Sequence, residues 1–206
     1  LQEAMRTYSF WIFNLSLGML ALYATAVTFH IVSVFSVADM DRVQAVSIFI
    51  PSSIIAVVIN LIAGRLSDFI RLKYLLILLL VALTVESVSV AFLKAGFWVW
   101  VLIVTKGLSE GLFGILMAVT WPKFYGRAHL GATAGFNMSC TVFFSAVGPS
   151  LFAFSLARTG SYQISSLLCG LVCVVLTVLA MKAEEPPAKR PSGSSGDSPS
   201  QITGDK

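Results

Sequence analysis

The sequence alternates long apolar stretches with short polar segments. Charged residues and turn-forming residues divide it into six apolar stretches, which cover residues 8–37, 43–63, 74–93, 97–121, 130–156 and 162–181. A hydrocarbon core of roughly 30 Å is crossed by about 20 mostly apolar residues in an α-helix. The pattern therefore predicts an all-α integral membrane domain with six transmembrane helices over residues 1–181.

Two of these stretches contain a proline well inside their ends. Pro51, which is followed by two serines, lies within the second stretch, and Gly148-Pro149 interrupts the fifth. Proline removes a backbone hydrogen bond from a helix, and neighbouring hydroxyl groups can satisfy the freed carbonyl. We expect Pro51, Gly148 and Pro149 to act as helix hinges, and an ordinary tolerated bend is the alternative.

The composition excludes an ordinary soluble domain. Hydrophobic residues make up 57% of the chain, charged residues 12%, and the mean hydropathy is +0.87. The lipid bilayer is therefore the expected partner, and no nucleic acid is expected, because the basic residues behind the net charge of +4 lie mostly in short loops. No metal-ligand spacing and no phosphate-binding loop is present in the sequence, so we expect no metal or other cofactor.

The distribution of Lys and Arg predicts the orientation of the helices. Most of these residues fall in the even-numbered loops and near the termini, whereas only Arg42, Lys94 and Arg158 fall in the other loops. The positive-inside rule then places both termini in the cytoplasm and the chain in the cell membrane as a multi-pass protein. Residues 182–206 lack aromatic residues and are rich in Pro, Ser, Gly and charge, so we expect a disordered tail.

Residues 64–73 form the polar segment between the second and third stretches. Its sequence, Gly-Arg-Leu-Ser-Asp-Phe-Ile-Arg-Leu-Lys, resembles the signature loop of the major facilitator superfamily, Gly-x-Leu-x-Asp-Arg-x-Gly-Arg-Lys. We assign a conformational latch to Gly64, Leu66, Asp68, Arg71 and Lys73, although Phe69, Arg71 and Leu72 depart from the pattern. The expected basis is close helix approach at Gly64 and an Asp68 carboxylate that bonds a helix N-terminus or nearby bases. A basic loop with one stray acid is the alternative.

The resemblance extends over residues 8–181. The late His30, residues 121–127 (Trp-Pro-Lys-Phe-Tyr-Gly-Arg) and the segment from Gly131 to Gly135 are similar to the oxalate/formate antiporter and monocarboxylate transporter branch. This resemblance implies secondary active transport of a small solute by alternating access, and no enzymatic activity.

Transporters of this superfamily have twelve helices in two six-helix halves, and each half consists of two inverted three-helix repeats. The polar tail, the start at Leu1 rather than at Met, and the branch resemblance make this chain similar to the C-terminal half. We therefore expect a further partner, either a missing N-terminal six-helix half or a second copy of the chain.

Lys106 and Glu110 are the strongest site candidates. They straddle the midpoint between Lys94 and Lys123, which places them near the membrane midplane, and their i, i+4 spacing puts both on one helix face. A charge at this depth costs roughly 2.5 to 3.5 kcal/mol on insertion scales, so it pairs or faces an aqueous cavity. Lys106 could hold the carboxylate of an organic anion, with Glu110 as its counter-ion and as a proton carrier. A self-neutralising pair that only joins helices is the alternative.

His30 and Glu86 are the other ionisable candidates. His30 lies in the predicted extracellular half of its span, where it could bond a solute, relay protons, or serve only as a packing residue. Glu86 lies near the middle of the third stretch, and for it we favour a structural role. The second and fifth stretches contain no basic residue where the oxalate carriers have theirs, so one Lys fits a monocarboxylate better than a dicarboxylate.

Two functions from other classes stay open. Residues 107–111, Gly-Leu-Ser-Glu-Gly, match the Gly-x-Ser-x-Gly nucleophile elbow, which together with His30 suggests an intramembrane serine hydrolase. Because this segment lies inside one apolar stretch, glycines that allow close helix packing are the simpler interpretation. A six-helix protein that binds or assembles a partner without transport is the other alternative.

Overall fold

The computed structural model describes residues 2–126 and 130–183, and these residues form α-helices without any strand. The helices are α1 (Gln2–Met5), α2 (Tyr8–Val37), α3 (Arg42–Ser47), α4 (Phe49–Leu66), α5 (Leu72–Ala91), α6 (Phe97–Tyr125), α7 (Leu130–Thr159) and α8 (Gln163–Met181). Six spans are long and apolar enough to cross a membrane, with α3 and α4 together forming the second. The predicted all-α membrane fold is therefore confirmed. Of the predicted tail 182–206, residues 184–206 lie outside the described residues.

The second span consists of two helices that meet at Ile48. α3 begins with a capping box, in which the Asp41 carboxylate accepts a hydrogen bond from Gln44 N at 2.7 Å and the Gln44 side chain accepts one from Asp41 N at 3.3 Å. α4 begins at Phe49 and contains Pro51 in its first turn, where the missing N–H has no partner within the helix in any case. The break in this span therefore comes before Pro51.

α6 is longer than the predicted stretch. It passes through Pro122 and ends at Tyr125, because its last turn packs against the start of α2. The Phe124 ring lies 4.9 Å from the Phe13 ring, and the Tyr125 hydroxyl lies 2.7 Å from Thr7 Oγ1. These contacts offset the backbone hydrogen bond that proline removes.

α7 runs through Gly148 and Pro149 as one helix, so the predicted interruption of the fifth stretch is wrong. A Cβ atom at Gly148 would overlap the carbonyl oxygen of Leu22 in α2, which shows that the two backbones touch at this position. The neighbouring helix supports α7 where Pro149 removes a bond.

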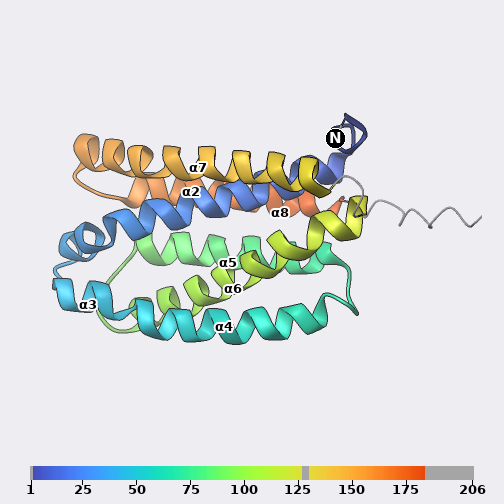
Figure 1. Ribbon diagram of the computed structural model, residues 1–206. Coiled ribbons are helices and arrows are strands. Elements are labelled where there is room, and N and C mark those ends of the chain that lie inside the picture. The colour runs from blue at the N-terminus through green and yellow to red at the C-terminus, as the bar shows by residue number, and fades with distance from the viewer. Residues whose placement is uncertain (1, 127–129, 184–206) are drawn as a thin grey trace, which may run out of the picture.

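The six spans run along one axis and are connected at its two ends, and the N-terminus lies at the same end as the last turn of α8 (Figure 1). α2 packs mainly against α7, α4 against α6, and α5 against both α6 and α8. An inverted repeat would relate α2 to α6, α4 to α7 and α5 to α8. Under this exchange the α2–α7 pair becomes the α6–α4 pair, and the α5–α8 pair is exchanged with itself. The packing therefore has the pseudo-two-fold symmetry of two inverted three-helix repeats.

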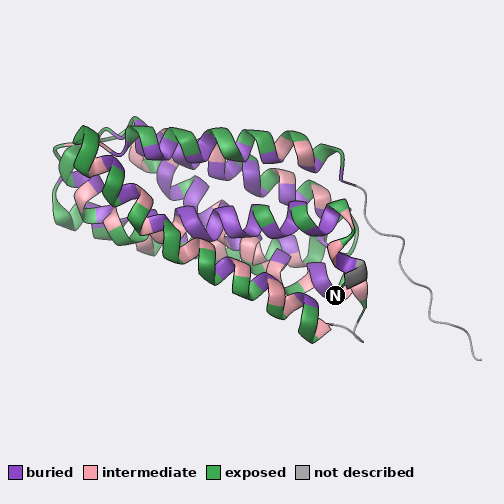
Figure 2. Cartoon of the chain, turned by 90° about the horizontal axis from the view of Figure 1, so that it is seen from above, coloured by how far each residue is buried: buried purple, intermediate pink, exposed green. Residues whose placement is uncertain are grey.

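Buried residues lie where the helices face one another, and exposed residues follow their outer sides (Figure 2). α4 and α7 are the least buried spans. Because lipid is as apolar as the interior, membrane helices associate through close packing and hydrogen bonds. One such link joins three helices: the Tyr23 hydroxyl of α2 lies 2.8 Å from Ser166 Oγ of α8, which donates to the Ser87 carbonyl of α5 at 2.8 Å.

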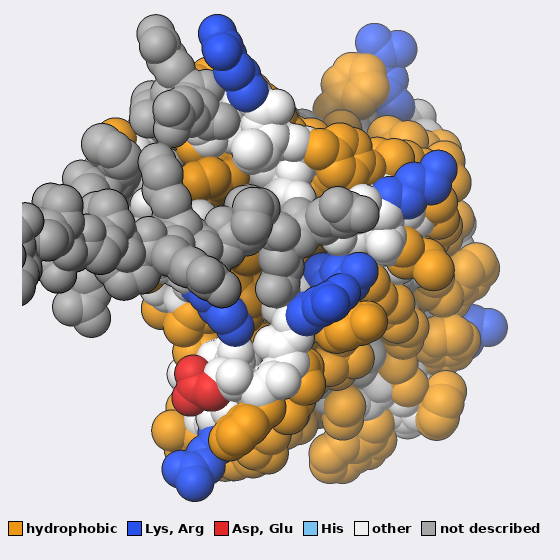
Figure 3. Space-filling view, turned by 90° about the vertical axis from the view of Figure 1, so that its right-hand side faces the viewer, with side chains coloured by type: hydrophobic (Ala, Val, Ile, Leu, Met, Phe, Trp, Pro, Cys, Tyr) orange, Lys and Arg blue, Asp and Glu red, His pale blue; other side chains and the backbone are white. Residues whose placement is uncertain are grey.

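Basic side chains are prominent at the end of the bundle that carries the N-terminus (Figure 3). The described basic residues at this end are Arg6, Arg65, Arg71, Lys73, Lys123 and Lys182. The opposite end carries Arg42, Lys94 and Arg158. The two ends of the domain therefore differ in charge in the way that the sequence predicts.

Candidate functional site

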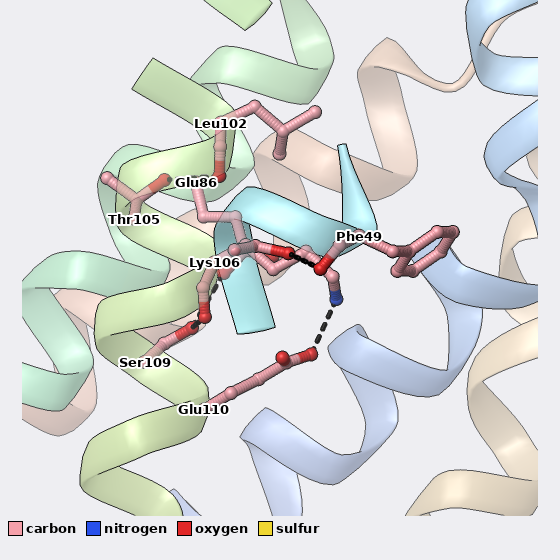
Figure 4. Close-up of polar contacts among 8 residues, drawn as sticks. Phe49, Glu86, Leu102, Thr105, Lys106, Ser109 and Glu110 are labelled. Atoms are coloured by element: carbon pink, nitrogen blue, oxygen red, sulfur yellow. Dashed lines mark hydrogen bonds and ion pairs between the residues drawn. The ribbon is translucent and has the colours of Figure 1, made fainter. Parts of the chain in front are cut away.

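Lys106 and Glu110 form the one ion pair found among the described residues. Lys106 Nζ lies 2.6 Å from Glu110 Oε1, and both side chains leave the same face of α6 (Figure 4). The Lys106 side chain is 1% exposed, whereas that of Glu110 is 35% exposed. The structure therefore brings the two predicted residues together as a buried cation and a carboxylate that remains accessible from outside the domain.

An aromatic ring also lies beside the Lys106 ammonium group. The Nζ atom lies 5.7 Å from the ring centroid of Phe49, the first residue of α4. A cation near an aromatic face is stabilised by the ring quadrupole, and more strongly so where water is excluded. Phe49 was not predicted, because no feature of the sequence indicates that the break before α4 faces the middle of α6.

Glycines let α4 and α6 approach closely beside this pair. A Cβ atom at Gly107 would lie 2.6 Å from the carbonyl oxygen of Ser52, and one at Gly111 would lie 2.6 Å from that of Ala56. Real Cβ atoms are not found at such distances, so these positions admit only glycine unless the helices move apart. The small-residue packing predicted for this segment is therefore present.

Glu86 of α5 contacts the same segment of α6 from the other side. Its carboxyl group is buried, with 1% of the residue exposed, and its Oε2 atom lies 2.9 Å from the hydroxyl oxygen of Ser109. That hydroxyl oxygen also lies 3.1 Å from the carbonyl oxygen of Lys106 (Figure 4). The structure thus adds Glu86 and Ser109 to the neighbourhood of the predicted pair.

The position of Ser109 argues against the hydrolase interpretation. A nucleophile elbow needs a sharp turn between a strand and a helix, so that the serine is exposed. Ser109 instead lies inside a continuous helix, is 1% exposed, and is in hydrogen-bond distance of Glu86. Its flanking glycines serve the contact with α4.

The predicted basis of the latch loop differs from the structure at two residues. A Cβ atom at Gly64 would lie 3.5 Å from the side chain of Ile115, which is an ordinary contact, so no close approach requires glycine here. Asp68 is exposed, and its carboxylate has neither a hydrogen-bond nor an ion-pair partner among the described residues. Among the described residues, the carboxylate of Asp68 therefore does not make the expected bonds to a helix N-terminus or to nearby bases.

A lysine outside the motif holds this loop instead. Lys123 Nζ, at the end of α6, donates a hydrogen bond to the carbonyl oxygen of Ser67 at 2.7 Å. Ser67 is the C-cap residue of α4, where free carbonyl groups concentrate partial negative charge. Leu66, Arg71 and Lys73 lie in or beside the loop, with Arg71 as the N-cap of α5 and Lys73 Nζ 5.6 Å from the Tyr74 ring centroid.

His30 lies near the opposite end of the bundle and far along α2 from the middle of the span. Its Nε2 atom lies 3.1 Å from the carbonyl oxygen of Pro149, and its Nδ1 atom lies 3.4 Å from the oxygen of the Tyr162 hydroxyl. That hydroxyl donates its hydrogen to Ser33 Oγ at 2.8 Å. Because a carbonyl oxygen only accepts, Nε2 carries the proton in this contact. His30 thus connects α2 to α7 and to the start of α8, and the structure does not bring it to Lys106.

The described residues contain no cluster of metal ligands. In residues 2–126 and 130–183, no group of three or more His, Cys, Asp or Glu side chains is arranged to hold a metal ion. The site consists of one base, two acids, a hydroxyl group and an aromatic ring on three helices.

Comparison with known proteins adds one piece of evidence to this geometry. The family model described as Major Facilitator Superfamily matches residues 4–204 of the chain. No curated protein matches the chain.

Proposed function

The chain belongs to the major facilitator superfamily, a family of secondary transporters, and from this premise we propose that it carries a small organic anion such as a monocarboxylate by alternating access. The observation that carries the proposal is the Lys106–Glu110 pair, in which a fully buried base is neutralised by a half-buried acid. A carboxylate solute has the same charge and shape as the end of the Glu110 side chain, so it can take the place of Glu110 at Lys106.

The charge balance of the site explains why the anion would move with a proton. Lys106 neutralises one carboxylate, and a second uncompensated negative charge at membrane depth is costly. When the solute occupies Lys106, Glu110 becomes neutral by binding a proton. Glu110 is the more exposed partner, which suits it to exchange that proton.

The number of basic residues favours a monocarboxylate over a dicarboxylate. Residues 49–63 of α4 and residues 130–156 of α7 contain no Lys or Arg. A second carboxylate on the solute would therefore find no second base within these two segments. This part of the proposal rests on the sequence of the two helices and on the single lysine of α6.

The proposal includes a second six-helix unit, because alternating access in this fold needs two halves around one cavity. The outer sides of α4 and α7 are exposed and largely apolar, which fits coverage by such a unit, either an N-terminal half or a second copy. We place the chain in the cell membrane with both termini on the cytoplasmic side. Most of the described basic residues lie at the end that carries α1 and the last turn of α8, and basic residues favour the cytoplasmic side.

Uptake of labelled monocarboxylates into proteoliposomes under an imposed pH gradient tests the function, with the full protein as wild type, Lys106→Ala and Glu110→Gln. We expect loss of uptake in Lys106→Ala, and in Glu110→Gln uptake that no longer responds to the pH gradient. Lys94→Ala, an exposed lysine at the end of the bundle, is the matched control and should behave as wild type. Normal uptake in both site variants would reduce the pair to a contact within α6, and absence of uptake in the wild type would remove the substrate class.

A further inference from the structure

Glu86 is the second buried acid of the site, and the proposed function does not use it. The residue is 1% exposed in α5, and its carboxyl group points to α6. In the part of the chain that the structure describes, Glu86 has no ion-pair partner. An ionised carboxylate in this position would be a buried charge without an ion-pair partner of its own while Glu110 holds Lys106, which is an expensive arrangement.

The hydrogen bonds of Ser109 bear directly on the state of this acid. The Ser109 hydroxyl oxygen lies 2.9 Å from Glu86 Oε2 and 3.1 Å from the carbonyl oxygen of Lys106. A hydroxyl group has one hydrogen, and a carbonyl oxygen only accepts. Both contacts are full hydrogen bonds if Glu86 carries a proton and donates it to Ser109, while Ser109 donates to Lys106. Ionised Glu86 would compete with the Lys106 carbonyl for the single serine hydrogen.

The other ionisable groups around Glu86 come from three helices. Tyr23 faces it from α2, Cys173 from α8 with Cys169 beside it, and Lys106 and Glu110 from α6. The Tyr23 hydroxyl is already 2.8 Å from Ser166 Oγ. Lys106 is therefore the one base among the described groups that face Glu86, and its ammonium group is held by Glu110 at 2.6 Å.

We propose that Glu86 is a proton-binding site that determines whether Lys106 is available to an anion. With its proton, Glu86 is neutral and leaves Lys106 to Glu110 or to a solute carboxylate. When the proton passes to water, the Glu86 carboxylate becomes a second internal counter-ion for Lys106 and competes with the solute. The competition part of this inference rests on the proposed function, whereas the bound proton does not.

The charge count gives the expected behaviour of a glutamine variant. Glutamine has the shape of protonated glutamic acid and cannot ionise, so Glu86→Gln should keep the neutral state at every pH. Wild-type anion exchange is expected to be lost at a lower pH than exchange by Glu86→Gln, because in the variant only the proton on Glu110 remains to be lost. Exchange without a pH gradient is the appropriate assay, because it requires solute binding but no net proton movement.

Infrared difference spectroscopy tests the bound proton without any transport assay. The full protein in lipid should show the carbonyl stretch of a protonated carboxylic acid at neutral pH, and this band should be absent from Glu86→Gln. It should be retained in the double variant Lys106→Met/Glu110→Gln, in which Glu86 is the acid that remains and no lysine faces it. In Ser109→Ala the band should shift, because its hydrogen-bond partner is gone. The Ser109 variant also keeps the test decisive if Glu86→Gln does not fold.

The possible results separate the two proposals. A spectrum without the carboxylic acid band, or a band that Ser109→Ala leaves unchanged, would overturn the assignment of the proton to Glu86. Alkaline loss of exchange that is equal in wild type and Glu86→Gln would overturn the competition for Lys106. If the band is present but the wild type exchanges no monocarboxylate, the proton site stands and the proposed substrate class fails.

Discussion

Asn60 of α4 donates a hydrogen bond from Nδ2 to the carbonyl oxygen of Gly111 in α6, over 3.0 Å. The same amide nitrogen would lie 2.6 Å from a Cβ atom at Gly114, so the absence of a side chain there makes room for the bond. The glycines of α6 and the Asn60 side chain of α4 thus contribute to one contact, which lies beside the Lys106–Glu110 pair along α6. The geometry of that pair depends on how closely the two helices approach.

Replacing Gly107 by alanine should force α4 and α6 apart. The new Cβ atom would lie 2.6 Å from the Ser52 carbonyl oxygen, and backbone atoms cannot move aside as a flexible side chain can. We expect a loss of about 1–3 kcal/mol in the free energy of unfolding, as for other overpacked positions. Denaturant unfolding in micelles measures it, with Gly135→Ala as the control, because a Cβ atom at Gly135 would meet no atom within 4 Å. Equal stability of the two variants would contradict the close packing.

Replacing Glu110 should destabilise the domain more than replacing Lys106. Glu110→Gln leaves the Lys106 charge unpaired in a site that is 1% exposed, whereas Lys106→Met leaves a carboxylate that is 35% exposed. Because an unpaired buried charge is the more costly, Glu110→Gln should destabilise the domain more than Lys106→Met. The double variant should be more stable than Glu110→Gln alone. A thermal unfolding series of the three variants decides this, and the reverse order would mean that Lys106 reaches water.

Replacing His30 should weaken the end of the bundle and leave uptake intact. Its ring joins α2 to the carbonyl oxygen of Pro149 in α7 at 3.1 Å, and removal of one such bond costs about 0.5–1.5 kcal/mol. Hydrogen exchange in α7 near Pro149 should become faster in His30→Ala, while Tyr162→Phe serves as a neighbouring control that keeps the Pro149 contact. Loss of uptake without any change in stability would instead assign His30 to the solute or to the proton path.

Lys123→Met should loosen the loop between α4 and α5. The ammonium group caps the Ser67 carbonyl at 2.7 Å, and a cation at a helix C-terminus contributes about 0.3–1 kcal/mol at an exposed site. Amide exchange over residues 67–70 should therefore increase. Lys73→Met is the matched control at the same end of the bundle, since Lys73 lies over the Tyr74 ring and caps no helix. Unchanged exchange in Lys123→Met would show that the loop is held by other contacts.

The apolar pattern predicted every membrane span, because each is long and bounded by charged or turn residues. It failed where neighbouring helices decide the outcome. Pro122 reads as a helix end, yet α6 continues to Tyr125 because Phe124 and Tyr125 pack against the start of α2. The fifth span reads as interrupted, yet contact between Gly148 and the α2 backbone keeps α7 continuous.

The site was predictable only within one helix. Lys106 and Glu110 are four residues apart, so helix periodicity alone places them together. Glu86 and Ser109 lie on different helices, and their contact depends on how α5 packs against α6, which spacing along the chain does not encode. The loop at residues 64–73 was identified from its sequence motif, but the hydrogen bond that holds it comes from Lys123, which lies outside the motif.

The pseudo-two-fold packing has a mechanical consequence. Gly107 and Gly111 seat α6 against the α4 backbone, and Gly148 seats α7 against the α2 backbone in the symmetry-related pair. Helices that touch backbone to backbone slide past each other less readily than helices separated by long side chains. The α4–α6 pair and the α2–α7 pair should therefore each move as a stiff unit, and Lys106 and Glu110 both belong to the first unit. A conformational change in this domain would then occur at the less closely packed boundary between the two units. Lys106 and Glu110 would move together and keep their ion pair.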